Sequence, residues 1–165
     1  MAKQGPPGSP TTAPLCPSAP GRPGESVLIG VVTGQPGSPR VMPTEAPVEV
    51  TEDLLALAAP VSPSEVFRFA SHCRGDACVH FSGKACQLAA RGVAILTEVT
   101  NEVPPCAIRP HCRWFRQEGI AICKRCPQIV TEQYAPSPEM LRVVLGDQLP
   151  QPGTTTDKTA GDAAP

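Results

Sequence analysis

The residues of this chain best suited to chemistry are its cysteines. Seven of the eight fall between positions 73 and 126, and four of these lie in the stretch CAIRPHCRWFRQEGIAICKRCP, which begins at residue 106. The opening residues MAKQGPPGSP lack the apolar run of a secretory signal, so we expect a cytoplasmic location. There thiols stay reduced, and clustered cysteines more often bind metal than form disulfides. The primary predicted metal site comprises Cys106, Cys112, Cys123 and Cys126.

The spacing of these four cysteines bears on the kind of metal. The pair Cys123 and Cys126 has C-x2-C spacing, which is half of a typical tetrahedral site. A dithiol redox role is less favoured, because no βαβ unit precedes the pair. The irregular spacings of the set, with Pro127 directly after Cys126, favour an iron–sulfur cluster such as [4Fe–4S]. Zinc is the alternative, since it also takes four thiolates.

Gly119 is a structural requirement of this site. In one straight helix, the eleven residues from Cys112 to Cys123 would separate the two thiols by about 16 Å. If the helix ends at Gly119, the chain turns back and Cys123 approaches Cys112 and Cys106. The metal-site hypothesis therefore predicts a break at Gly119.

A second group of cysteines lies upstream. Cys73, Cys78 and Cys86 lack a fourth cysteine nearby, and His80 or His72 could supply the missing ligand. A Cys₃His zinc site, a second iron–sulfur cluster with one non-cysteine ligand, and a set shared with the downstream quartet all stay open. Cys86 could also be an ordinary buried residue. Cys16 stands apart in the N-terminal segment, where we expect no specific role for it.

Basic residues surround the downstream quartet. The segment 105–131 carries five of them against the single acid Glu118, although the whole chain has a net charge of −1. They would offset the negative charge of a thiolate-ligated metal and form a basic face on which a larger protein docks. Nucleic acid is a weaker candidate for the same face, and no membrane partner is expected. The five residues are Arg109, Arg113, Arg116, Lys124 and Arg125.

The distribution of prolines and aromatic residues sets the domain boundaries. Of 22 prolines, 13 lie in residues 1–63, whereas all aromatic side chains lie between positions 67 and 134. Segments rich in Pro, Gly and Ser bury too little apolar area to offset their ordering entropy. We therefore predict a disordered tail over 1–25, a lead-in segment over 26–62, a cysteine-rich metal-binding domain over 63–146 and a disordered tail over 147–165.

Within these boundaries the patterns predict mostly helices. Residues 26–33 are β-branched and indicate a short strand, with a second at 48–50. Helices are expected at 52–59, 63–71, 84–100 and 110–118, and a final helix or strand at 139–145. The expected fold is a small α-rich (α+β) metal-stabilised domain with irregular loops between disordered tails. So small a core commonly depends on a metal or on disulfides.

Two stretches resemble a known group of proteins. PPCAIRPHCRWFRQEGIAICKRCPQIVT and the upstream FRFASHCRGDACVHFSGKAC are similar to small bacterial cysteine-rich proteins that share a C-x5-C-R-W-F…C-x2-C-P core. The resemblance covers about residues 66–131. It implies a bacterial metal-binding domain and supplies no substrate and no catalytic residue.

These observations lead to three functional hypotheses. The favoured one is an iron–sulfur protein in electron transfer or redox sensing, or an accessory to a larger enzyme. The second is a zinc-stabilised module that binds protein or nucleic acid. The third is a metal-dependent subunit in a biosynthetic pathway. No phosphate-binding loop, nucleophile elbow or carboxylate pair identifies the chain as an enzyme.

Overall fold

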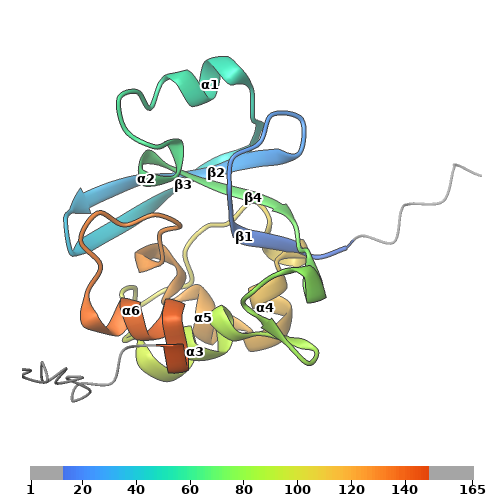
Figure 1. The fold of residues 1–165 in the computed structure, drawn as a ribbon, viewed down its shortest axis with the longest axis vertical. Coiled ribbons are helices and arrows are strands. Elements are labelled where there is room, and N and C mark those ends of the chain that lie inside the picture. The colour runs from blue at the N-terminus through green and yellow to red at the C-terminus, as the bar shows by residue number, and fades with distance from the viewer. Residues whose placement is uncertain (1–12, 149–165) are drawn as a thin grey trace, which may run out of the picture.

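The computed structural model describes residues 13–148, and its centre is a four-stranded antiparallel sheet in the order β1-β4-β2-β3 (Figure 1). The sheet strands are β1 (Leu15–Ala19), β2 (Ser26–Gln35), β3 (Ser38–Glu49) and β4 (Phe67–His72), and the hairpin strands are β5 (Phe81–Ser82) and β6 (Ala85–Cys86). The helices are α1 (Glu52–Ala56), α2 (Pro63–Val66), α3 (Gln87–Ile95), α4 (Arg113–Glu118), α5 (Ile120–Cys123) and α6 (Pro138–Leu145). The short 3₁₀ turns are η1 (Gly75–Ala77), η2 (Arg109–His111), η3 (Cys126–Gln128) and η4 (Gly146–Gln148).

Side-chain alternation along the two central strands creates a core on each face of the sheet. In β2, Val27 packs with the helices α3 to α6, whereas Leu28 packs on the opposite face against Val50 and Ala58. Successive side chains of a strand point to opposite faces. The same rule places Phe67 and Phe69 of β4 in the second core, and turns Arg68 and Ala70 toward the helices.

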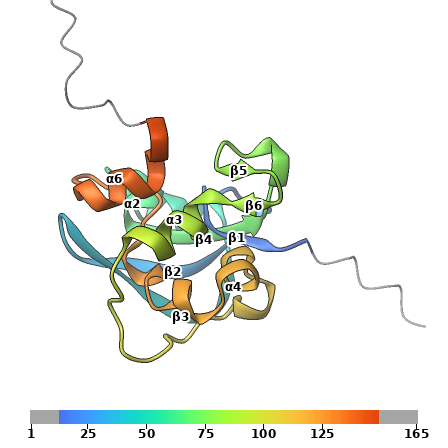
Figure 2. The same ribbon diagram turned by 90° about the horizontal axis from the view of Figure 1, so that it is seen from below.

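The helices occupy both sides of the sheet unequally. Figure 1 shows α3 to α6 together on one side and α1 on the other. Seen from below, the β5–β6 hairpin lies beside β1 (Figure 2). Helix α4 contacts both β1 and β6, so the N-terminal strand and the cysteine-bearing hairpin meet at α4.

The prolines that lie within strands of the N-terminal half are on edge strands. Pro39 and Pro43 lie in β3 and Pro17 lies in β1, the two edges of the sheet. A missing backbone N–H is tolerated there because an edge strand has one side without a neighbour. The prediction of a disordered tail over 1–25 is therefore wrong for residues 13–25, which include β1. The lead-in segment 26–62 supplies β2 and β3 of the sheet and then α1. The tail predictions for 1–12 and for 149–165 fall outside the described residues.

The helix predictions hold only in part. The strand at 26–33 is confirmed by β2, and the break at Gly119 separates α4 from α5. The predicted helix 63–71 is wrong beyond Val66. The Ser62–Glu65 capping box starts one helical turn, and Phe67 to His72 then form β4, because alternating aromatic residues fill one face of a strand. The predicted helix 84–100 is shortened to α3, whose last residue is Ile95.

The prediction of an α-rich, metal-stabilised domain is wrong. The fold is a mixed α+β arrangement whose apolar side chains close two cores on a sheet. Within residues 13–148, no group of three His, Cys, Asp or Glu side chains is arranged to hold a metal ion. Across the same residues, each helix is too short or too polar to cross a membrane.

Candidate metal centre

All four cysteines of the predicted primary site line one cavity of about 60 Å³. Cys106 follows the Pro104–Pro105 pair, Cys112 precedes α4, Cys123 ends α5 and Cys126 begins η3. A buried site needs roughly 10–15 Å³ of such volume per water molecule, so this cavity has room for a group of several atoms. The remaining walls are mainly apolar and include Ile29, Pro43, Trp114, Phe115 and Ile122.

Gly119 makes the convergence possible. Its backbone has φ +64° and ψ −145°, a region that essentially only glycine adopts. A Cβ at this position would meet nothing within 4 Å, so the requirement for glycine comes from the backbone and not from crowding. The turn ends α4 and starts α5 in a new direction, which brings Cys123 to the cavity that Cys112 lines.

Burial makes two thiols of this site, those of Cys112 and Cys123, harder to deprotonate. Burial raises the pKa of Cys112 to about 12, and the neighbouring Cys126 and Cys106 add to the rise. Burial also raises the pKa of Cys123, against the opposing effect of a hydrogen bond from Arg109. A metal binds the thiolate, so ligation at Cys112 must release a proton.

Arg68 is the most unusual residue of the cavity wall. It is 2% exposed, and its guanidinium donates to the carbonyl oxygens of Pro17 (2.6 Å), Cys126 (2.6 Å) and Ile129 (2.7 Å). Its Nη2 atom is buried without a partner, and Cζ lies 5.4 Å from the centroid of Trp114. The ion pairs within residues 13–148 join Arg22 to Glu25 and join Lys124 and Arg125 to Glu98, so no acid offsets Arg68.

Arg109 adds a second positive charge. Its Nη2 donates to the carbonyl of Pro104, and its Nε is buried without a partner. Buried charges in proteins are normally paired, since leaving one alone costs several kcal/mol. The cavity thus combines four thiols with two arginines, one buried and one half-buried, that have no acidic partner among the described residues.

A single metal ion and a cluster place different demands on the positions of the sulfur atoms. A tetrahedral zinc with Zn–S bonds of about 2.3 Å requires sulfur atoms only about 3.8 Å apart. The side chains of residues 13–148 offer no such set. An iron–sulfur cluster places iron and sulfide between the cysteines and so needs a wider ring of thiols around a cavity. Four cysteine thiols that line one cavity are the kind of donor set that such a cluster uses.

The predicted basic face is divided by the structure. Lys124 and Arg125 lie 3.4 Å from carboxylate oxygens of Glu98, and Arg113 stacks on Phe81 at 4.8 Å. Arg109 lines the cavity, which leaves Arg116 as the exposed member of the five.

The upstream residues lie on the β5–β6 hairpin and its preceding turn. Cys73 and Cys78 are half-buried and Cys86 is buried. His80 is half-buried too, and its pKa is lowered by burial and by the charge of Arg91. Helix α4 holds the hairpin, because the Gln117 side chain accepts from the Cys86 N–H (2.7 Å) and donates to its carbonyl (2.9 Å).

The sequence patterns assigned no functional role to two residues of this region, Arg68 and Cys16. Arg68 could have been found from the alternation F-R-F, which buries an arginine once the segment is assigned as a strand. Cys16 was assigned to a tail, whereas it lies in β1.

Comparison of the chain with protein-family models, with curated proteins and with solved structures finds no match.

Proposed function

We propose that this chain binds an iron–sulfur cluster through Cys106, Cys112, Cys123 and Cys126 and acts in electron transfer or redox sensing. The observation that carries the proposal is the cavity that these four cysteines share with the buried Arg68. A cluster held by four thiolates has a net charge of about −2, which would balance the two positive charges of Arg68 and Arg109.

The residues around the cavity suit one-electron chemistry, which such a cluster supplies when bound. Arg68 and Arg109 place positive charge beside the thiols and would favour the reduced state, because net charge and hydrogen bonds set the reduction potential. Trp114 and Ile122, each 1% exposed, keep water from the inner wall. Cys106 is exposed and gives the site an edge that an electron donor can approach.

A larger protein partner would dock at this exposed edge. We place the contact around Cys106, His111 and Arg116, all of which are exposed. Lys124 and Arg125 contribute less, since Glu98 offsets their charge. The basic character of the contact favours an acidic face on the partner.

The test is metal analysis of the full chain purified under anaerobic conditions. We expect a coloured protein containing iron and acid-labile sulfide in equal amounts. Cys126→Ala should remove the iron bound at this site. Gln128→Ala is the matched control, because Gln128 lies on the same 3₁₀ turn, is half-buried and does not line the cavity.

Two outcomes would refute the proposal. Iron that is retained in Cys126→Ala at the wild-type level would remove the quartet from the site. A colourless protein that contains zinc, or no metal after anaerobic reconstitution with iron and sulfide, would exclude the cluster. Zinc at one equivalent would instead support the alternative of a binding module.

A further inference from the structure

A cavity of about 530 Å³ lies where the β1–β2 connection meets the end of β4. Binding sites for small molecules commonly enclose about 300–1,000 Å³, so its size suits a small organic ligand. It shares no lining residue with the cavity that the four cysteines of the proposed cluster line. A ligand bound there would therefore be separate from the cluster. Its walls include Arg22, Glu25, Ser71 and Arg74.

The β1–β2 connection, which forms one wall, is fixed over the sheet. Gly21 lies against the ring of Phe69, where an added Cβ would be only 2.6 Å from a ring carbon. The buried Ser26 hydroxyl donates to the Pro20 carbonyl (2.9 Å) and accepts from the Arg22 N–H (3.1 Å). The backbone that carries Arg22 is thus ordered before any ligand binds, which lowers the entropic cost of binding.

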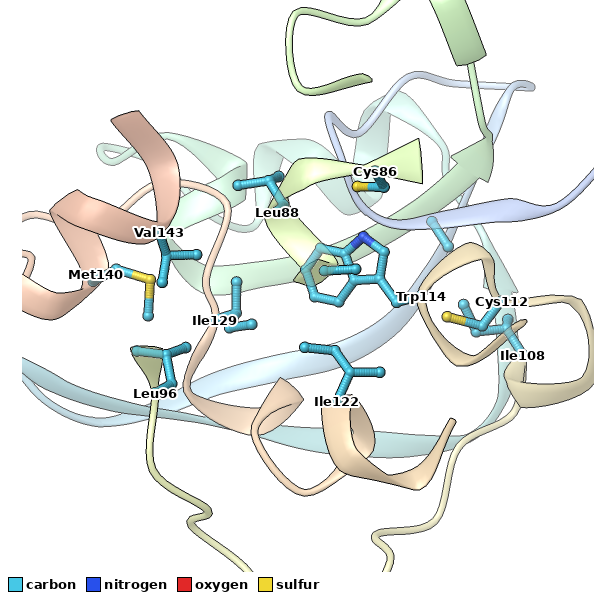
Figure 3. Close-up of a cluster of buried hydrophobic side chains, with 12 residues drawn as sticks. Cys86, Leu88, Leu96, Ile108, Cys112, Trp114, Ile122, Ile129, Met140 and Val143 are labelled. Atoms are coloured by element: carbon cyan, nitrogen blue, oxygen red, sulfur yellow. The ribbon is translucent and has the colours of Figure 1, made fainter. Parts of the chain in front are cut away.

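The end of β4 forms the other wall. Ala70 packs in the core around Trp114 that Figure 3 shows. Successive residues of a strand face opposite sides, so Ser71 faces the other side of the sheet together with Phe69. This is the side on which the β1–β2 connection lies against Phe69. Arg74 follows the strand and directly precedes the turn η1.

Two guanidinium groups at this cavity are available to a ligand. Arg74 is exposed and has no ion-pair partner within residues 13–148. Arg22 has one partner, Glu25, but the two charged groups are 3.7 Å apart and their side chains are 59% and 68% exposed. So long and so exposed a pair contributes little to stability, and Arg22 can bind another anion instead. An arginine fork matches the oxygens of a phosphate group, to which the Ser71 hydroxyl can also donate.

The remaining features of the cavity narrow the class of ligand. Phe, Tyr and Trp are absent from the described residues that line it, so no such ring would stack on a nucleobase. The Glu25 carboxylate can only accept hydrogen bonds, and it repels a second anionic group. It therefore suits a hydroxyl group on the uncharged part of the ligand.

We propose that this cavity binds the phosphate monoester of a small sugar. Arg22 and Arg74 hold the phosphate group from the two walls, and the Ser71 hydroxyl donates to it. Glu25 accepts a hydrogen bond from a hydroxyl group of the sugar. Binding does not depend on the metal content of the chain, since the two cavities have no residue in common.

The experiment is calorimetric titration of the full chain at low salt with glucose 6-phosphate, inorganic phosphate and glucose. We expect glucose 6-phosphate to bind at one site per chain, inorganic phosphate to compete with it more weakly, and glucose not to bind. Arg22→Gln and Arg74→Gln should each weaken the binding of glucose 6-phosphate about tenfold or more, because each removes a hydrogen bond to a charged group. Arg142→Gln is the matched control, since Arg142 is exposed on α6 and does not line the cavity.

Ser71→Ala keeps both arginines and should weaken binding several-fold, so it tests the site even if an arginine variant fails to fold. The proposal would be overturned if glucose 6-phosphate did not bind at millimolar concentration, if glucose bound equally well, or if the arginine and Ser71 variants all bound like wild type. A chain that binds glucose 6-phosphate but no iron would support this site and overturn the cluster. A chain that binds iron but no glucose 6-phosphate would do the reverse.

Discussion

Replacement of Gly119 by alanine isolates the backbone requirement of the site. The glycine adopts φ +64° and ψ −145°, and an added Cβ would meet nothing within 4 Å. The cost is therefore conformational, about 1–3 kcal/mol for a non-glycine residue in this region. Alanine also lowers the conformational entropy of the unfolded chain, which stabilises the folded state by about 0.4–1 kcal/mol. We expect the free energy of unfolding to fall by about 1–2 kcal/mol.

The assay is urea unfolding of the cofactor-free, reduced protein, together with iron content after reconstitution. If the backbone relaxes to relieve the strain, α5 shifts and Cys123 moves relative to Cys112, so iron at the downstream site should fall as well. Gly24→Ala is the matched control, since Gly24 has φ +72° and equally open surroundings but lies before β2. It should lose stability and keep its iron. Unchanged stability and iron in Gly119→Ala would refute the reasoning.

Three further predictions concern single groups. Burial raises the Cys112 pKa from 9.0 to about 12, so the folded state holds this proton more tightly than the unfolded state. The free energy of unfolding of the cofactor-free protein, measured with urea, should therefore fall as pH rises above about 9. Cys112→Ala should weaken that pH dependence. Arg68→Met removes positive charge from the cavity wall, so a redox titration should give a more negative potential than wild type, whereas exposed Arg142→Met should leave it unchanged. Gln117→Ala leaves the Cys86 N–H and carbonyl without their side-chain partner, which should cost about 1–3 kcal/mol in urea unfolding; an unchanged free energy of unfolding would contradict this role of Gln117.

The downstream site was predictable because its constraints are local. Cys106, Cys112, Cys123 and Cys126 lie within a short stretch, and simple helix geometry shows that they can meet only if the helix ends at Gly119. The structure confirms that break. Whether the four thiols bind iron stays a prediction, since spacing alone does not choose between metals that take the same ligands.

The sheet depends on contacts between distant residues. Strand β1 pairs with β4, and the paired residues are at least fifty positions apart. Proline content suggested disorder for the same segment, although prolines on edge strands are compatible with a sheet. The capping signal at Ser62 does start a helix, but the predicted helix was extended too far. The alternating residues that follow form strand β4.

The two apolar cores, and not a bound metal, account for the burial that stabilises this fold. Trp114, Ile122 and Val143 in one core, and Phe69 and Val50 in the other, are buried by contacts among themselves. A domain organised by metal would place its ligands where the core is otherwise missing. Here Cys86 and Cys112 are themselves members of a core that apolar side chains fill, while Arg68 is buried without an acidic partner among the described residues. Such a cation is costly to the fold itself, and a negatively charged group beside it would offset that cost. The two apolar cores thus account for the stability of the fold, and we propose the cysteines as a binding site that the sheet supports.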